Sequence, residues 1–382
     1  MKLCYICHGY PPAGVGGIET FTQTLARGLV LRGHQVWVVG YSNGFLVEVE
    51  EDDQGVHVLR LPPVKRGIFP SVLSIHLRLE AAVRRVVRRN DCQLVECPDV
   101  RGSLITGRLG APLVVRMHGA NLVHFPATGR HPPRLTPFFE KRTLRLADHL
   151  VAVSQYICDA TLTAADLQHR PCDVIYNGVD TSLFRPQAGA ERDPSHILFV
   201  GRLSETKGAP NLFRALPTVL EHFPNARLRY VGGDPANAAG VRASESLIAV
   251  LPERWRAHVE LTGTLPHQEM PVEYQRAAVA VFPSRAEAHP IAVVEAMACG
   301  TPVVFMNYGP GPEMIEHAQE GLLCDTRSPQ AIAEAILAIL SDPQRAQIMG
   351  ARAAKRVAET LSLESAIVRN EAFYRRCLKG AV

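Results

Sequence analysis

Two series of short apolar runs, separated by helix-compatible sequence, constrain the fold of this 382-residue chain most strongly. Such runs suit parallel strands that are buried on both faces. The first series predicts strands at residues 2–8, 35–40, 56–61, 92–96, 113–117, 149–153 and 173–176. The second series predicts strands at residues 196–200, 226–231, 258–261, 278–282, 302–305 and 321–324. The alternation therefore predicts an α/β protein with two Rossmann-like, doubly wound units.

A polar stretch at residues 186–194 separates the two series. It contains two prolines and no apolar periodicity, which is typical of a linker. We therefore predict an N-terminal domain over residues 1–186 and a second domain over residues 187–360. The end of the chain predicts three successive helices, at residues 329–340, 343–360 and 363–378.

Composition excludes several classes of protein. With 47% hydrophobic and 20% charged residues and a formal net charge of +4, the chain predicts a globular protein, and its charge favours no nucleic-acid partner. Its nine scattered cysteines lie mostly in apolar runs and predict reduced core thiols rather than a metal site. We find no run of about eighteen apolar residues and no signal peptide, so we expect a cytoplasmic protein, at most peripheral to a membrane.

The stretch at residues 282–304 combines a strand end, an acidic loop, a helix and the next strand. The predicted helix covers residues 291–299, and Gly300 stands where a helix end favours a left-handed residue. Glu287 in the loop and Glu295 in the helix can both face a crevice at the carboxyl ends of a parallel sheet. The alternative is that both are solvated charges, with Glu287 favoured by the helix dipole.

Two cations follow the first strand of the second series. Arg202 and Lys207 are flanked by Gly201 and Gly208 at a predicted strand-to-helix turn. A guanidinium and an ammonium held there can neutralise a diphosphate. Two solvated surface charges are the alternative.

The first strand is followed by a glycine-rich turn that contains Gly14, Gly16 and Gly17. Such glycines let backbone N–H groups approach a phosphate at a helix N-terminus, although a plain tight turn explains them equally well. The turn is not the dinucleotide fingerprint, because Glu19 stands where that pattern needs glycine. His118 ends another predicted strand, where it either contacts a ligand or forms a structural hydrogen bond.

Two of these motifs resemble those of the retaining glycosyltransferases of family 4. The acidic stretch has a Glu, seven residues, a second Glu and then Ala-Met-Ala-x-Gly-x-Pro-Val-Val, and Gly-Arg-Leu-x-x-x-Lys-Gly is similar to the family's phosphate clamp. The resemblance implies that Glu287 lies against the donor sugar and Glu295 holds the ribose hydroxyls. It also implies that Arg202 and Lys207 bind the donor diphosphate.

The resemblance further implies a glycosyltransferase B fold with the active site in the cleft between the domains. The N-terminal domain would face the acceptor and the second domain would bind the nucleotide sugar. Residues 361–382 would form a helix that packs back on the first domain. Gly16 and Gly17 would lie beneath the diphosphate, and His118 would lie against the donor sugar.

The chain departs from the family in the donor-sugar loop. Where the family usually has Glu-Gly-Phe-Gly, Glu287 is followed by Ala288, His289 and Pro290, with Ile291 next. Pro290 has no N–H to offer a sugar hydroxyl, and His289 is a candidate replacement donor. The departure leaves the identity of the donor sugar open.

We therefore expect a retaining hexosyltransferase that uses a nucleoside diphosphate sugar, with UDP favoured over GDP. The acceptor is a hydroxyl group of a saccharide, a small molecule or a lipid-linked compound. No cofactor and no obligatory metal are expected, because Arg202 and Lys207 supply the positive charge. The alternatives are an epimerase or phosphorylase on the same fold and a non-catalytic subunit that binds nucleotide sugars.

A basic stretch at residues 78–89 carries five arginines and an apolar stripe. The favoured interpretation is a helix that packs on the first sheet with its arginines in water. The alternative is attraction to anionic lipid headgroups, which is worth about 1 kcal/mol per basic residue near the surface.

Overall fold

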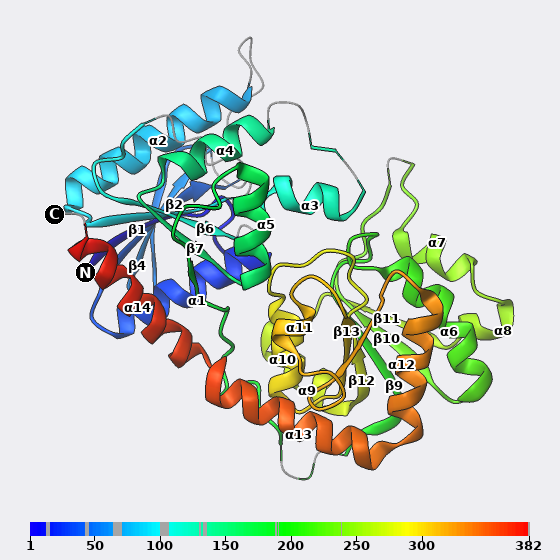
Figure 1. Cartoon of the computed structure of the whole chain (residues 1–382). Helices are drawn as coiled ribbons and strands as arrows, with labels where there is room; N and C mark the ends of the chain where they lie inside the picture. The colour runs from blue at the N-terminus through cyan, green and yellow to red at the C-terminus, as the bar shows by residue number, and fades with distance from the viewer. Residues whose placement is uncertain are drawn as a thin grey trace. The chain divides into compact units, whose positions relative to one another are not determined.

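The computed structural model comprises two α/β units (Figure 1). It describes residues 1–12, 16–42, 46–63, 71–99, 107–129, 131–132, 136–187, 189, 191–237 and 239–380. Unit 1 contains Met1–Asn177 and Leu363–Val382, and unit 2 contains Gly178–Ser362. The two-unit α/β class predicted from the alternating series is confirmed.

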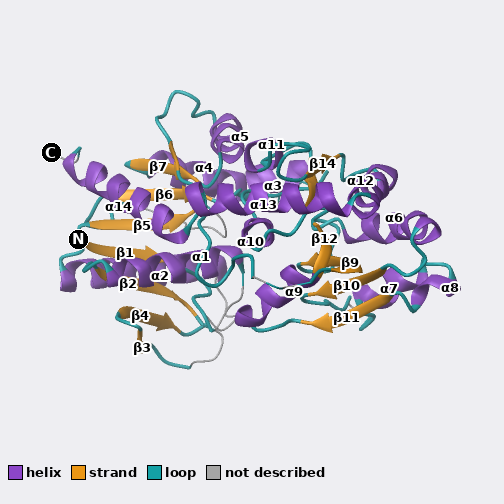
Figure 2. Ribbon diagram, turned by 90° about the horizontal axis from the view of Figure 1, so that it is seen from below, coloured by secondary structure: helices purple, strands orange, loops and turns teal. Residues whose placement is uncertain are grey.

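Unit 1 is built on an eight-stranded sheet of order β3-β4-β2-β1-β5-β6-β7-β8. Its strands are β1 (Lys2–Ile6), β2 (Gln35–Tyr41), β3 (Val49–Asp53), β4 (Val56–Leu61), β5 (Leu94–Pro98), β6 (Leu113–Met117), β7 (His149–Ala152) and β8 (Asp173–Val174). Its helices are α1 (Gly17–Leu31), α2 (Ser71–Asn90), α3 (Asn121–Ala127), α4 (Thr136–Leu146), α5 (Gln155–Ala165) and α14 (Leu363–Lys379). All strand pairs are parallel except β3 with β4 (Figure 2).

Strand β3 is the strand that the sequence did not predict. Its sequence, VEEDD, has no apolar alternation because it forms the antiparallel edge of the sheet, where one row of side chains meets water. The turn to β4 uses Gln54 at φ 57° and Gly55 at φ 86°, and two left-handed residues suit a tight hairpin.

Unit 2 is built on a six-stranded parallel sheet of order β11-β10-β9-β12-β13-β14. Its strands are β9 (Asp193–Val200), β10 (Arg227–Val231), β11 (Val259–Gly263), β12 (Ala277–Val281), β13 (Val303–Met306) and β14 (Leu322–Cys324). Its helices are α6 (Ala209–His222), α7 (Ala243–Ala249), α8 (Glu253–Arg256), the 3-10 turn η1 (His267–Glu269), α9 (Met270–Arg276), α10 (Ile291–Ala298), α11 (Gly311–Met314), α12 (Pro329–Ser341) and α13 (Pro343–Thr360).

Helices α6 and α12 cover one face of the second sheet. Their apolar residues form one cluster with residues of five strands, among them Ile197, Leu228, Val279 and Val304. The intervening strand residues, such as Leu198 and Ala280, are equally buried on the other face. Burial on both faces explains why these strands are continuous apolar runs in the sequence.

The border between the units differs from the prediction. The structure places it at Asn177/Gly178, ahead of the predicted boundary after residue 186, because residues that precede the polar linker pack on unit 2. Phe184 is 1% exposed and its ring lies 6.1 Å from that of Tyr274. Val179 N donates to Leu361 O at 3.0 Å.

Helix α14 belongs to unit 1, where a buried polar network joins it to the sheet. Arg116 on β6, 1% exposed, donates from Nε to Glu96 Oε1 at 2.7 Å and from Nη2 to Asn370 Oδ1 at 2.6 Å. Tyr374 donates to Glu96 Oε2 at 2.8 Å, and Tyr5 donates to Tyr374 Oη at 2.9 Å. The paired carboxylate of Glu96 outweighs burial and raises the pKa of Arg116.

The arginines of α2 are engaged largely with glutamates. Arg85 pairs with Glu48 at 2.5 Å, and Arg89 pairs with Glu50 at 3.5 Å. The helix contacts β1 and β2, which supports the sheet-packing interpretation of this stretch. No helix within the described residues is long and apolar enough to cross a membrane.

The buried network of α14 should contribute strongly to the local stability of that helix. Replacing Glu96 by Gln leaves the guanidinium of Arg116 without its counter-charge, and breaking a buried pair costs about 3–5 kcal/mol. We expect hydrogen exchange of the α14 amides to show a loss of that order in local unfolding free energy. The control is Arg32→Ala, which removes pairs with Glu364 and Glu371 at a partly exposed site and should cost below about 1 kcal/mol. Equal losses in the two variants would contradict the assignment.

Candidate functional site

The loops after β9 and β12 lie against each other at the carboxyl edge of the unit 2 sheet. The two strands are parallel neighbours, so their carboxyl ends meet at one edge. Gly208, at φ 71°, approaches the other loop so closely that a Cβ atom there would lie 1.7 Å from the carbonyl oxygen of Pro283. Arg285 N donates to Thr206 O at 2.8 Å. Backbone contact thus fixes the two loops together.

This contact brings Lys207 to Glu287. Lys207 Nζ donates to Glu287 Oε1 at 2.6 Å, and Ser284 Oγ donates to the same oxygen at 2.7 Å. The Glu287 side chain is 11% exposed and that of Lys207 is 36% exposed. A charge-assisted pair of this kind orients the carboxylate of Glu287. The Lys207 side chain is still exposed enough to bind a further anion. The sequence predicted both residues, but neither their contact nor Ser284.

Ser284 is itself held by the ends of the next two strands. Its carbonyl oxygen accepts from Thr326 Oγ1 at 2.7 Å and from Tyr308 Oη at 3.4 Å. The two hydroxyls also lie 2.8 Å apart. The loops after β13 and β14 therefore support the loop that carries Glu287.

Arg202 is exposed at the same edge, on the turn between β9 and α6. The turn is fastened to the loop after β10, because Leu203 N donates to Gly233 O at 3.0 Å and Tyr230 Oη donates to Gly201 O at 2.8 Å. Gly232, at φ 148°, leaves no room for a Cβ atom beside Gly201 O. Arg202 is thus an exposed residue on a fixed backbone.

Glu295 lies in the second turn of α10 and is 6% exposed. Its Oε1 lies 2.6 Å from His267 Nε2, and its Oε2 accepts from Tyr274 Oη at 3.0 Å. The hydrogen bond to Glu295 raises the pKa of His267, whose side chain is 52% exposed. Each carboxylate oxygen keeps a second lone pair for a ligand hydroxyl. Neither His267 nor Tyr274 could be predicted from a local motif, because their contacts with Glu295 span 28 and 21 residues.

The loop from Ala288 to Ile291 leads into α10, which begins after Pro290 and ends at Ala298. Gly300 adopts φ 69°, so its predicted left-handed conformation is confirmed. His289 is 4% exposed, and burial lowers its pKa to about 3. The imidazole is therefore neutral and largely buried, and its role as a replacement donor stays a prediction.

His118 lies in unit 1, directly after β6. Its backbone N donates to Asp99 Oδ1 at 2.8 Å, and its ring meets the ring edge of Phe21 at 5.4 Å. Burial and the charge of Arg116 lower the pKa of His118 to about 3. The neutral ring can exchange hydrogen bonds with a hydroxyl group, but it brings no positive charge.

Gly16 and Gly17 lie at the start of α1 in unit 1. A Cβ atom at Gly16 would lie 2.3 Å from Glu19 Oε2, whereas space around Gly17 is open. The first amides of a helix have no partner within it, so this end is compatible with an anion. Gly14, which belongs to the same motif, lies outside the described residues.

Two family models match the chain. "Glycosyltransferase Family 4" matches residues 15–183, and "Glycosyl transferases group 1" matches residues 180–356. An uncharacterized glycosyltransferase of Methanocaldococcus jannaschii is 29% identical and covers 90% of each chain. D-inositol 3-phosphate glycosyltransferase 1 of Catenulispora acidiphila is 29% identical over 96% of this chain and 92% of the relative. The GDP-mannose-dependent alpha-(1-6)-phosphatidylinositol monomannoside mannosyltransferase of Mycolicibacterium smegmatis is 28% identical over 90% and 91%.

Solved structures share the fold. Sucrose-phosphate synthase of Thermosynechococcus elongatus superimposes with a TM-score of 0.82 at 22% identity, over 100% of this chain and 99% of that one. Anabaena HepE, solved with UDP and glucose, gives a TM-score of 0.74 at 21% identity, over 98% and 99%.

The buried state of His289 predicts a pH dependence of stability. In the unfolded chain a histidine takes up a proton below about pH 6.5, whereas the folded protein excludes that proton until about pH 3. The unfolded state therefore binds more protons in this window, and the free energy of unfolding falls as the pH falls. We expect the single histidine to contribute a loss of about 2 kcal/mol between about pH 7 and about pH 5.

His289→Gln should remove this part of the dependence. The measurement is urea unfolding of unit 2, followed by Trp255 fluorescence in a Trp37→Phe background. Exposed His222→Gln is the control and should keep the wild-type slope. An unchanged slope in His289→Gln would contradict the neutral, buried assignment.

Proposed function

The chain belongs to the glycosyltransferases of family 4, with the glycosyltransferase B fold, and we propose that it transfers a hexose from a nucleoside diphosphate sugar to a hydroxyl group with retention of configuration. The observation that carries the proposal is the contact of Lys207 with Glu287 at 2.6 Å. It joins the residue proposed for the diphosphate to the residue proposed for the sugar. A donor bound across this pair would place its breaking bond beside both groups.

The proposed leaving group is the nucleoside diphosphate. Its negative charge grows as the glycosidic bond breaks, so Lys207 and Arg202 would stabilise the transition state more than the bound donor. Both stand on a turn that backbone hydrogen bonds fix, so little reorganisation is needed. We propose that these cations make a metal ion dispensable.

Glu287 would act on the other side of the breaking bond. Ser284 and Lys207 orient its carboxylate, and its low exposure keeps the electrostatic interaction strong. Positive charge develops at the anomeric carbon in the transition state, and a nearby carboxylate stabilises that charge. Family resemblance is the reason for proposing retention.

Glu295 would bind the ribose hydroxyls through the lone pairs that His267 and Tyr274 leave available. Since both partners donate, the carboxylate stays an acceptor and its orientation is fixed before the ligand binds. Preorganisation of this kind lowers the entropic cost of binding.

For unit 1, we propose that Gly16 and Gly17 approach the donor diphosphate and that His118 contacts the donor sugar. The neutral state of His118 suits a hydrogen bond with a hydroxyl group. We propose that the acceptor hydroxyl belongs to a saccharide, a small molecule or a lipid-linked compound. A cytoplasmic location agrees with eight buried cysteines and a ninth, Cys172, that is partly exposed, all nine being unbridged thiols.

UDP remains our first choice of donor nucleotide and GDP the second. One solved neighbour contains UDP, whereas one relative is named as GDP-mannose-dependent. A thermal-shift panel of UDP and GDP sugars would identify the donor. Slow donor hydrolysis by the purified protein would then separate an enzyme from a binding subunit, and interconversion of sugar nucleotides without acceptor would indicate an epimerase.

Removal of either clamp cation tests the diphosphate assignment. Loss of one charge-assisted hydrogen bond is worth about 1.5–3 kcal/mol, or about tenfold to a hundredfold in rate. We expect Lys207→Ala and Arg202→Ala to lower kcat by that factor and to weaken donor binding less. Arg214→Ala, on the exposed face of α6, is the control and should leave kcat unchanged. Wild-type kcat in both clamp variants at saturating donor would show that the assignment is wrong.

The two glutamates should respond differently to removal. Glu295→Ala should weaken free nucleoside diphosphate and intact donor alike, because a ribose contact is present in both. Glu287→Ala should leave free nucleotide affinity nearly intact and lower the transfer rate, because the contact strengthens in the transition state. Calorimetric titration of both variants with nucleotide and donor distinguishes them. Equal weakening of free nucleotide by the two substitutions would contradict the assigned roles.

A further inference from the structure

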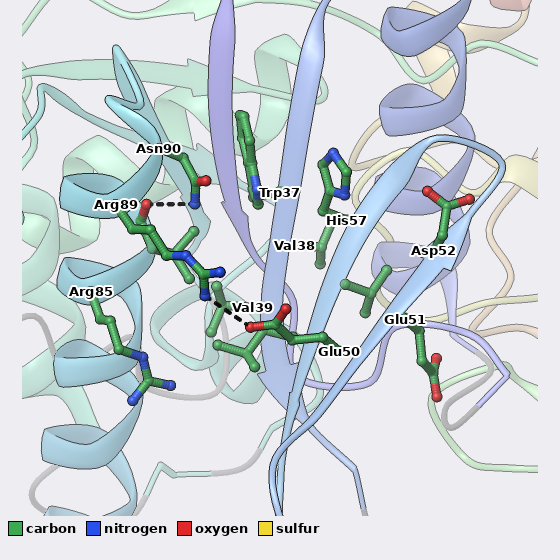
Figure 3. A pocket seen from close by; sticks show the side chains of 13 residues that line it. Trp37, Val38, Val39, Glu50, Glu51, Asp52, His57, Arg85, Arg89 and Asn90 are labelled. Carbon is green, nitrogen blue, oxygen red and sulfur yellow. Dashed lines mark hydrogen bonds and ion pairs between the residues drawn. The ribbon is translucent and has the colours of Figure 1, made fainter.

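A cavity lies in unit 1, lined by residues of α2, β2, β3 and β4. Its volume is about 360 Å³, within the lower range of small-ligand pockets. It opens between α2 and the β3–β4 hairpin (Figure 3). We call it the α2 pocket; its lining residues include Trp37, Val39, Glu50, Asp52, His57, Leu59, Arg85, Val86, Arg89 and Asn90.

The pocket exists because α2 packs on β1 and β2 and leaves part of the sheet face uncovered. The strand register places Trp37, His57 and Asp52 in one row across β2, β4 and β3. The next row on the same face contains Val39, Leu59 and Glu50. Each row therefore runs from a buried or partly buried apolar residue to an acidic residue at the edge.

The floor of the pocket is apolar and one end is aromatic. Val39, Leu59 and Val86 are at most 8% exposed. The ring of Trp37 stacks on that of His57 with centroids 5.3 Å apart and planes at 24°. Trp37 is partly buried and His57 is exposed, and both stacked rings line the pocket. Aromatic rings of this kind bury apolar area while keeping a polar edge in water.

The rim carries hydrogen-bonding groups, and its two arginines are paired with glutamates. Arg89 and Glu50 extend toward each other across the opening and pair at 3.5 Å, and Arg85 pairs with Glu48 (Figure 3). Asp52 Oδ1 accepts from Gly55 N at 3.0 Å. Asn90 donates from Nδ2 to Val86 O, which leaves its amide oxygen as an acceptor.

Charge balance narrows the class of ligand. A nucleotide or another polyanion would meet the Asp52 carboxylate and arginines that glutamates already neutralise. A polycation would find one lining carboxylate, that of Asp52, for which the described residues show no ion pair. A neutral saccharide matches the arrangement, because its C–H faces suit an aromatic and apolar floor. Its hydroxyls both donate and accept, as the mixed rim requires.

From these features we infer that the α2 pocket binds a neutral saccharide at a place separate from the transfer site. The inference builds on the proposed function only in taking a saccharide as a compound that the enzyme encounters. Binding to the pocket involves no transfer, so it can be measured whether or not the enzyme turns over. A glycan held there would stay near the enzyme between successive transfers.

The chain offers a direct probe, because Trp37 and Trp255 are its only tryptophans. Trp255 belongs to unit 2 and packs against His258, with ring centroids 5.3 Å apart. In Trp255→Phe protein the emission therefore reports the α2 pocket alone. The matched control is Trp37→Phe, in which the emission reports unit 2 alone.

We expect maltoheptaose or mannotriose to change the emission of Trp255→Phe protein saturably and to leave that of Trp37→Phe protein unchanged. Loss of one aromatic contact is worth about tenfold in Kd, so calorimetry should show binding about tenfold weaker in Trp37→Ala. Arg89→Ala changes a rim side chain that is 73% exposed, so it tests the pocket without disturbing the core. It should weaken binding severalfold, and donor hydrolysis should stay at the wild-type rate in both variants.

Three results would overturn the inference. The first is no saturable change at Trp37 with either saccharide. The second is a response of Trp37 to inorganic pyrophosphate in place of the saccharides, which would make the pocket an anion site. The third is concentration-dependent dimerisation that Trp37→Ala abolishes, which would make it an interface between copies of the chain. If saccharide binds the pocket while donor hydrolysis is absent, the proposed function fails and this inference stands.

Discussion

The close approach of Gly208 to Pro283 is the contact on which the candidate site of unit 2 depends. Two neighbouring parallel strands end at the same edge, but their loops can touch only if one of them has no side chain at the crossing point. With the backbones in contact, a lysine on one loop reaches a glutamate on the other at 2.6 Å. Any larger residue at Gly208 would displace the carbonyl of Pro283 and separate the two groups. The chemistry proposed for the site thus begins with a backbone constraint.

Sequence alone predicted the strands that are buried on both faces, because an apolar run is itself the signature of such burial. It failed at β3, where an edge strand of acidic residues carries no apolar pattern. The domain border also differed, because Phe184, just ahead of the polar stretch, packs on Tyr274. Composition describes a segment on average, whereas one buried aromatic side chain can decide which unit the segment joins.

For the site, the sequence supplied the residues that belong to local motifs and omitted those that support them. Lys207 and Glu287 are visible through their motifs, but Ser284, His267 and Tyr274 act through contacts that only the fold creates. His289 shows a further limit of prediction from the sequence. Its place beside Pro290 suggested a replacement hydrogen-bond donor, and the sequence did not show that the side chain is buried or that burial lowers its pKa to about 3. Position along the chain cannot show the direction of a side chain.

Both units use the same device to hold a loop at a sheet edge. In unit 1, the carboxylate of Asp99 follows β5 and accepts from the backbone N–H groups of His118 and Ala120, which follow the neighbouring strand β6. In unit 2, the carboxylate of Glu287 follows β12 and accepts from Lys207, which follows the neighbouring strand β9. Each cross-link joins adjacent parallel strands, so it fixes a loop without requiring long-range order. The two differ in exposure: Asp99 is buried, which raises its pKa to about 7, whereas Glu287 shares its oxygen with the ammonium group of Lys207, whose side chain is 36% exposed. The Asp99 cross-link therefore suits a structural role. The Lys207–Glu287 cross-link leaves a cation available to a ligand, which is why we assign chemistry to unit 2.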